Sequence, residues 1–102
     1  MQLTPQQVLK RLSTSQVVDV RETDELAEGM IPGARHIALG DLVQSLGMLD
    51  REMPVIAVCR SGRRSATAAE SLVGAGFDAH TMSGGMIEWK VQGLPTVDPQ
   101  HS

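Results

Sequence analysis

The sequence predicts one α/β domain with a mostly parallel sheet and helices on both of its faces. Short β-branched runs alternate with segments of helical character along the chain, which is the order that produces strand–helix–strand units. The most apolar run, 55–58, indicates a strand buried on both faces of such a sheet. The 102 residues, 41% of them hydrophobic and 21% charged, suffice for one globular core. We therefore expect a single domain over residues 1–97 and a disordered tail over 98–102.

The first third of the chain predicts a helix, a strand and a second helix. Thr4 is a typical N-cap, Pro5 suits the first helical position, and Gln7 completes a capping box three residues after the cap. The β-branched run 16–20 predicts a buried parallel strand. Acidic residues crowd the segment 22–28, which predicts a short solvated helix ended by the glycine that follows it.

The middle of the chain predicts a strand and a helix before the most apolar run. A proline and a glycine in 31–34 indicate a turn, and the residues after it predict a second strand over 35–39. The segment 41–46 begins with an aspartate and predicts a helix that Gly47 closes. A proline then separates this helix from the strand over 55–58.

The last third repeats the alternation. Small and helix-compatible residues predict a helix from Arg64 or Ser65 to about Val73, followed by a glycine-rich end. A last strand is expected over 79–82 and a last helix over 85–91. Because ligands bind beyond the carboxyl ends of the strands in parallel sheets, a functional site is expected at that edge.

Composition and charge argue against several classes of function. The net charge of −3 and the presence of only one tryptophan and one phenylalanine provide neither a basic field nor a stacking platform, so we expect no nucleic-acid partner. One cysteine cannot form an intramolecular disulfide, which favours a reducing compartment. His36, His80 and His101 are isolated from one another, so no metal site is predicted.

The chain also lacks the patterns of membrane and export segments. Its first residues have neither a basic region nor an apolar stretch typical of a signal peptide. No apolar run approaches the roughly 20 residues that span a bilayer. We therefore expect no membrane segment and a cytoplasmic location.

The single cysteine follows the most apolar strand and is the candidate nucleophile. The loop after it contains a glycine and three arginines and leads into a helix, so backbone N–H groups, a helix N-terminus and cations should converge on the sulfur. Such surroundings lower the pKa of a thiol and keep it as the reactive thiolate. The predicted catalytic residue is Cys59, and the predicted substrate-binding residues are Arg60, Ser61, Gly62, Arg63, Arg64 and Ser65.

The spacing within this loop distinguishes between anion chemistries. Cysteine-dependent phosphatases carry Cys-x5-Arg, in which the arginine grips phosphoryl oxygens. Here the last loop arginine is Arg64, which gives Cys-x4-Arg and a ring of amides tighter by one residue. A tighter ring suits one additional sulfur atom on Cys59 better than a phosphoryl group. A disulfide-based reductase usually needs a resolving thiol, and the chain has no second cysteine.

Several pieces of the chain, taken in order, resemble the single-domain rhodaneses, or thiosulfate sulfurtransferases. The sequence departs from the family at Met30, where a histidine is common. The pieces that carry the resemblance are Val18-Asp19-Val20-Arg21 with Glu25, the segment from Gly29 to Ile37, the loop from Cys59 to Ser65, Gly84-Gly85 with Trp89, and Gly93-Leu94-Pro95.

The resemblance implies a rhodanese-like α/β fold with a central sheet of about five parallel strands. It implies transfer of sulfane sulfur through a persulfide on Cys59, without a metal or an organic cofactor. The implied donor is a small sulfur anion such as thiosulfate, and the implied acceptor is cyanide in the assay and a thiol or protein cysteine in the cell. A non-catalytic sulfur-carrier or docking module is an alternative, and a small cysteine-dependent phosphatase or arsenate-handling enzyme is another.

Four further residues have expected roles near or below this edge of the sheet. Asp19 ends a strand, where its carboxylate is either a hydrogen-bonded structural group or a partner that orients a loop arginine. Arg21 and Glu25 are expected to pair near the surface. Trp89 is expected to anchor the last helix in the core.

Overall fold

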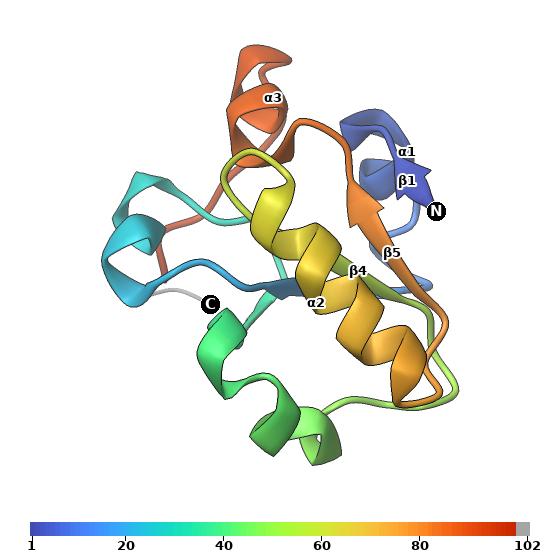
Figure 1. Ribbon diagram of the computed structural model, residues 1–102. Coiled ribbons are helices and arrows are strands. Elements are labelled where there is room, and N and C mark those ends of the chain that lie inside the picture. Colours follow the sequence, from blue (N-terminus) through green and yellow to red (C-terminus); the bar gives the residue numbers. More distant parts are fainter. Residues whose placement is uncertain (100–102) are drawn as a thin grey trace.

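The computed structural model describes residues 1–99, in which five strands and several helices alternate along the chain (Figure 1). The predicted tail, apart from Asp98 and Pro99, lies outside these residues. The strands are β1 (Gln2–Leu3), β2 (Gln16–Asp19), β3 (Arg35–His36), β4 (Val55–Val58) and β5 (Ala79–Met82). The helices are α1 (Pro5–Lys10), α2 (Arg63–Gly74) and α3 (Gly85–Val91), with 3₁₀ helices η1 (Thr23–Glu28), η2 (Leu39–Asp41) and η3 (Val43–Met48).

The five strands form one parallel sheet in the order β1-β5-β4-β2-β3. The predicted mostly parallel sheet of about five strands is confirmed. The central strand β4 pairs with β2 on one side and with β5 on the other, with Val58 opposite Asp19 and Ala57 opposite Thr81. All four residues of β4 are buried, as its continuous apolar run predicts.

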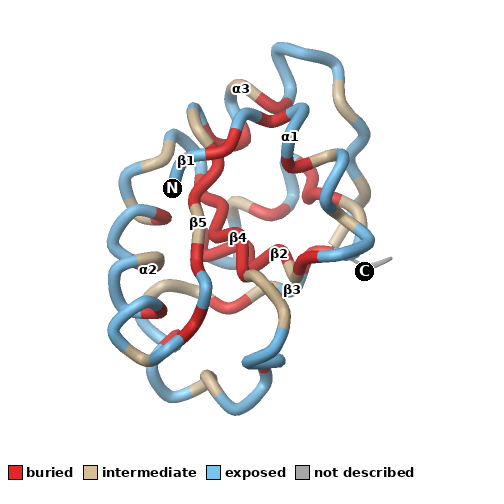
Figure 2. Tube along the Cα trace, turned by 90° about the vertical axis from the view of Figure 1, so that its right-hand side faces the viewer, coloured by how far each residue is buried: buried red, intermediate tan, exposed pale blue. Residues whose placement is uncertain are grey.

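Helices cover both faces of the sheet, as predicted, and alternate residues of β4 serve the two layers. Ile56 and Val58 pack with residues of α1 and α3, such as Val8 and Trp89, in one hydrophobic cluster. Val55, Ala57 and Cys59 pack on the other face in a cluster that includes Ala68 and Leu72 of α2. Figure 2 shows the buried strands in the centre with the exposed surfaces of the helices outside them. This period of two follows from the pleat of a strand.

The edge strand β1 was not among the strands expected from the residue pattern. Its two residues are too few to show a period, and pairing with β5 defines the strand: the Thr81 N–H donates to Met1 O and the Ser83 N–H to Leu3 O. The strand expected over 35–39 is shorter than predicted, because only Arg35 and His36 pair with β2 and Leu39 already begins η2.

The two short helices predicted before β4 are 3₁₀ helices rather than α-helices. The acidic segment forms η1, and the helix expected over 41–46 is divided into η2 and η3. Gly47 does not close this region, because η3 continues to Met48. Short segments commonly adopt this tighter helix.

The predicted caps and anchor are confirmed. Thr4 Oγ1 accepts a hydrogen bond from the Gln7 N–H, and the Gln7 side chain accepts one from the Thr4 N–H, so the capping box is complete. Trp89 is fully buried, and its indole N–H donates to the Pro95 carbonyl at 2.8 Å. No helix among residues 1–99 has the length and apolar character needed to cross a membrane.

A buried ion pair joins the end of β2 to the segment before Met30. The Arg21 side chain is buried, and its guanidinium donates to both carboxylate oxygens of Asp19, with Nη2 2.8 Å from Oδ2. Arg21 also donates to the carbonyl oxygens of Gly29 at 2.8 Å and Glu25 at 3.3 Å. The expectation of a surface pair between Arg21 and the Glu25 carboxylate is therefore wrong, and Asp19 has the structural role rather than the orientation of a loop arginine.

We predict that Arg21→Met lowers the free energy of unfolding by about 3–5 kcal/mol, because it leaves the Asp19 carboxylate buried without its partner. Urea denaturation at neutral pH measures this loss. Arg35→Met is the matched control, since Arg35 is exposed on β3 and its loss should change stability by no more than about 0.5 kcal/mol. Equal stabilities of the two variants would contradict the prediction.

Candidate active site

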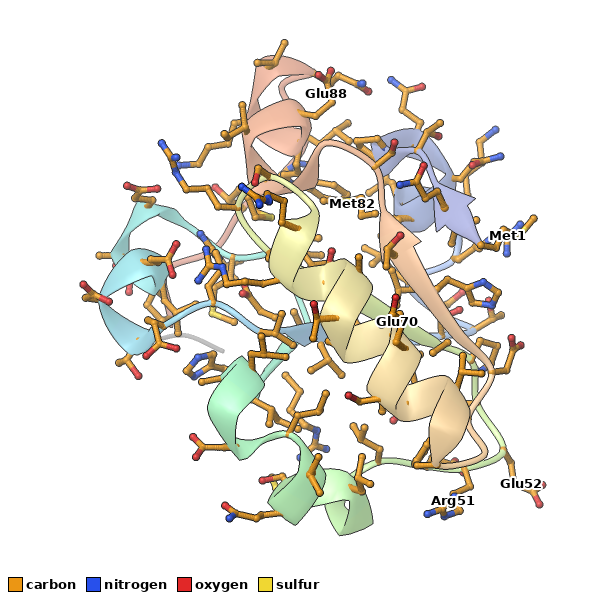
Figure 3. The ribbon with its side chains drawn as sticks, viewed as in Figure 1. Met1, Arg51, Glu52, Glu70, Met82 and Glu88 are labelled. Atoms are coloured by element: carbon orange, nitrogen blue, oxygen red, sulfur yellow. The ribbon has the colours of Figure 1, made fainter. Side chains whose placement is uncertain are left out.

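The candidate site lies at the edge of the sheet where the parallel strands end. Cys59 follows the last residue of β4, and the loop from Cys59 to Gly62 leads directly into α2. Met82, at the end of β5, lies on this side of the molecule, whereas Arg51 and Glu52 lie at the opposite end (Figure 3). The predicted site residues are thus at the edge of the sheet where binding sites of parallel sheets are found.

Backbone N–H groups converge on the sulfur of Cys59. The Gly62 N–H donates to Sγ at 3.0 Å, and the Ser65 N–H donates to it at 3.3 Å. Gly62 is the N-cap of α2 and has a φ of +110°, which only glycine adopts easily. Ser65 is buried, and its hydroxyl donates to Gly62 O at 3.1 Å, so it also holds the turn closed.

These hydrogen bonds lower the pKa of Cys59 below its ordinary value. Burial acts in the opposite direction, because Cys59 is only 1% exposed and desolvation favours the neutral thiol. Hydrogen bonds from Ser65, Gly62 and Ser61 outweigh it and favour the thiolate. The sequence pointed to arginines and amides together, and in the structure backbone N–H groups and the Ser65 side chain lower this pKa.

The start of α3 donates hydrogen bonds to the loop that follows β4. The Met86 N–H donates to Cys59 O at 2.9 Å, and the Ile87 N–H donates to Arg60 O at 3.1 Å. This contact requires Gly85, which has a φ of +60° and lies so close that a Cβ on it would be 2.4 Å from Arg60 O. The glycine pair at the start of α3, Gly84 and Gly85, marked the family resemblance in the sequence, but its supporting role was not predicted.

The three loop arginines have different surroundings. Arg64 forms a bidentate pair with Glu25 of η1, with Nη1–Oε1 at 2.5 Å and Nη2–Oε2 at 2.7 Å. This hydrogen bonding lowers the pKa of Glu25 to about 2, although its partial burial opposes the shift, and the same pairing raises the pKa of Arg64. Arg60 and Arg63 are exposed, and neither has an ion pair within the part of the chain that the structure describes.

The structure therefore groups the predicted residues into three sets. The N–H groups of Gly62, Ser65 and Ser61 act on the sulfur, Arg60 and Arg63 are exposed, and Arg64 is paired with Glu25. Glu25 was not among the predicted site residues, and the signal for it was its place in the acidic segment after β2. Within residues 1–99, no group of three or more histidine, cysteine and acidic side chains is arranged to hold a metal ion.

We predict that Glu25→Gln lowers the free energy of unfolding by about 1 kcal/mol at pH 7, a modest amount because solvent screens this partly exposed pair. The folded-state pKa of Glu25 lies below its ordinary value of 4.5, so the pair stabilises the fold above pH 4.5 and loses this contribution as the pH falls toward 2. Urea denaturation across this range should show wild type and variant converging.

Glu70→Gln is the control for this experiment, because Glu70 is exposed on α2 and forms no ion pair within residues 1–99. Its stability should follow that of the wild type at every pH. A constant difference between Glu25→Gln and wild type from pH 7 to pH 2 would contradict the role of the ion pair.

The sequence is similar to those of known proteins. The Rhodanese-like domain family matches residues 4–92. YtwF of Bacillus subtilis is 40% identical over 79 residues, which cover 78% of this chain and 77% of that protein. The thiosulfate sulfurtransferase GlpE of Pseudomonas aeruginosa is 33% identical over 90 residues, which cover 86% of this chain and 82% of GlpE.

The fold is also similar to solved structures. A rhodanese-related protein from Thermoplasma volcanium superposes with a TM-score of 0.90 and 29% identity, covering 94% of this chain and 96% of that one. Together with the family match over most of the sequence, this similarity shows that this chain belongs to the rhodanese-like domain family.

Proposed function

We propose that the protein is a sulfurtransferase that carries sulfane sulfur as a persulfide on Cys59. Family membership and relatives named as sulfurtransferases support this class of enzyme. The observation that carries the persulfide mechanism is the pair of N–H groups on Sγ, from Gly62 at 3.0 Å and Ser65 at 3.3 Å. They stabilise sulfur in its anionic and nucleophilic form without a metal ion.

In the first step the Cys59 thiolate attacks the outer sulfur of a donor such as thiosulfate. A new S–S bond forms on Cys59 while the S–S bond of the donor breaks, and sulfite departs with the bonding electron pair. Both bond changes occur between sulfur atoms, so the step needs no external oxidant or reductant. The amides that solvate the thiolate also suit the charge on the persulfide.

In the second step a nucleophilic acceptor attacks the outer sulfur of the persulfide. Cyanide would become thiocyanate, and a thiolate would become a new persulfide. The electron pair of the broken S–S bond returns to Cys59, which restores the thiolate. Dividing the transfer into two displacements is the usual advantage of a covalent intermediate.

The exposed cations suit the recognition of an anionic donor. Arg60 and Arg63 flank the ring of amides and carry no ion pair among the described residues, so their charges are available to the donor. Arg64 is engaged by Glu25 and would act by positioning the loop. The local positive charge contrasts with the net charge of −3 of the whole chain, and such a contrast concentrates small anions at the site.

The geometry favours sulfur transfer over phosphoryl transfer. A phosphatase needs a free guanidinium to bind phosphoryl oxygens. Arg64 is not free, because both of its terminal nitrogens donate hydrogen bonds to Glu25. Cys59 is also almost completely buried, with an exposed fraction of 1%. An unhindered terminal sulfur atom can approach such a site more easily than a tetrahedral phosphorus centre can.

A sulfur-carrier module remains the second candidate, since the same persulfide would serve a protein that receives sulfur from a partner. Slow loading from thiosulfate together with rapid loading from a protein donor would favour this alternative. A cytoplasmic location would suit either function, because a lone thiol stays reduced there.

We predict that incubation with thiosulfate adds one sulfur atom, about 32 Da, to the protein, and that cyanide then removes it as thiocyanate. Intact-mass spectrometry and a thiocyanate assay measure the two steps. Because Cys59 is the only cysteine in the chain, the added mass can be assigned without digestion.

Cys59→Ser should gain no mass and form no thiocyanate, while Ser71→Ala, an exposed change on α2, should behave as wild type. Hydrolysis of an aryl phosphate should be absent from all three proteins. A wild type that gains no sulfur from thiosulfate or polysulfide would overturn the proposal, as would phosphatase activity that depends on Cys59.

We also predict that the thiolate of Cys59 persists below pH 9.0, the ordinary pKa of the group, because the hydrogen bonds from Ser65, Gly62 and Ser61 outweigh the effect of burial. A titration of the ultraviolet absorbance of the thiolate measures its midpoint, with Cys59→Ser as the blank. A midpoint at or above pH 9.0 would contradict a thiolate stabilised by these amides.

A further inference from the structure

We propose that the outer face of α3 is a docking surface for an acidic, cysteine-bearing segment of an acceptor protein. The inference rests on the proposed function and identifies the acceptor more closely. The surface consists of Arg60, Ile87, Lys90 and Val91, and it borders the loop that holds the persulfide. In Figure 3, Glu88 of α3 lies at the end of the molecule where Met82 and the carboxyl ends of the strands also lie.

The surface is physically continuous with the loop. The Ile87 N–H donates to Arg60 O, and Arg60 directly follows Cys59 in the chain. A cavity of about 230 Å³ lies here between η1, the loop and α3. The lining residues of this cavity are Glu28, Arg60, Met86, Ile87 and Lys90.

The size of the cavity favours a peptide over a small ligand. Pockets that bury a whole small molecule usually have volumes of roughly 300–1,000 Å³, and this one is smaller. A volume of about 230 Å³ accommodates an apolar side chain, and the buried Met86 provides an apolar floor for it. A segment that places one side chain there would continue over the neighbouring surface of α3.

That neighbouring surface is apolar where a globular protein usually exposes polar groups. Ile87 is 45% exposed and Val91 is 74% exposed. On α3, Lys90 follows Ile87 by three positions and Val91 follows it by four. The three side chains therefore share one face of the helix. Val91 lies about 6 Å beyond Ile87 along the helix and does not line the cavity, so it extends the surface beyond the reach of a small thiol.

The charges around this face select an acidic partner. Arg60 and Lys90 line the cavity, are exposed and have no ion pair among residues 1–99, whereas Glu28 is the one acidic residue that lines it. Glu88, also on α3, accepts a hydrogen bond from Gln92 Nε2 at 2.9 Å. The two cations along the cavity outnumber its one carboxylate, which would steer an acidic segment to it at low salt.

A small surface with both apolar and charged residues also suits sulfur transfer to an acceptor protein. An acceptor must arrive, take one sulfur atom and leave, and such transient encounters have small interfaces. The acceptor thiolate attacks the outer sulfur of the Cys59 persulfide, a new S–S bond forms on the acceptor, and the electron pair of the broken bond returns to Cys59. The step is balanced and needs no further reactant.

The test uses two short synthetic peptides, each with one cysteine between leucines. One peptide carries glutamates beside the cysteine, and the other carries lysines at the same positions. The full chain is loaded with sulfur from thiosulfate, freed of donor and mixed with each peptide at low salt. Intact-mass spectrometry follows the loss of sulfur from Cys59, and thiocyanate formation from cyanide is measured in parallel.

We expect the acidic peptide to remove sulfur about tenfold faster than the basic one, an advantage that added salt should reduce. Lys90→Glu and Val91→Glu should each slow transfer to the acidic peptide at least about threefold while leaving thiocyanate formation unchanged. The controls are Lys10→Glu, which changes the other lysine of the chain, and Val43→Glu, since Val43 is 71% exposed on η3. Both controls should transfer sulfur as wild type does.

Two outcomes would overturn the docking surface while leaving the proposed function intact. One is equal transfer to both peptides at low salt, and the other is a Val91→Glu variant that behaves like Val43→Glu, each with normal thiocyanate formation. A wild type that neither loads sulfur nor forms thiocyanate would overturn the proposed function, and this inference with it.

Discussion

A buried sulfur anion is stable only where other groups replace the water that would solvate it. Burial of Cys59 by itself raises the pKa of the thiol, and the N–H groups of Gly62 and Ser65 reverse this effect from 3.0 and 3.3 Å. These groups converge because the chain turns sharply at Gly62 and enters α2 at once. The candidate site therefore depends mainly on backbone geometry, which side-chain substitutions at the surface would leave intact.

Two other elements keep that geometry in place. The first turn of α3 donates hydrogen bonds to the carbonyl oxygens of Cys59 and Arg60. The helix can come this close to the loop only because residue 85 is a glycine without a Cβ. At the other end of the loop, Glu25 of η1 binds Arg64 in the first turn of α2. The loop is thus held at both ends by segments far from it in sequence. The same approach of α3 creates the cavity beside Arg60, so support of the loop and the proposed docking surface have one structural cause.

Much of the fold could be predicted because it depends on local patterns. The run 55–58 is apolar at every position, which marks a central parallel strand, and Thr4 with Gln7 defines a helix start within four residues. The edge strand β1 could not be recognised, since two residues show no period and only β5 makes them a strand. The 3₁₀ character of the segment 23–28 was likewise not recognised, because a short segment of helical residues can form either kind of helix.

The sequence by itself determined the parallel α/β class, the place of the lone thiol after the central strand and the glycine that lets the loop turn, because each depends on neighbouring residues. Only the tertiary structure decided the partners of the charges. Arg21 pairs with Asp19 in the interior, and Glu25 pairs with Arg64 across 39 positions of the chain. Which charged side chains pair depends on how close they lie in the folded chain. That closeness cannot be read from their spacing along the sequence.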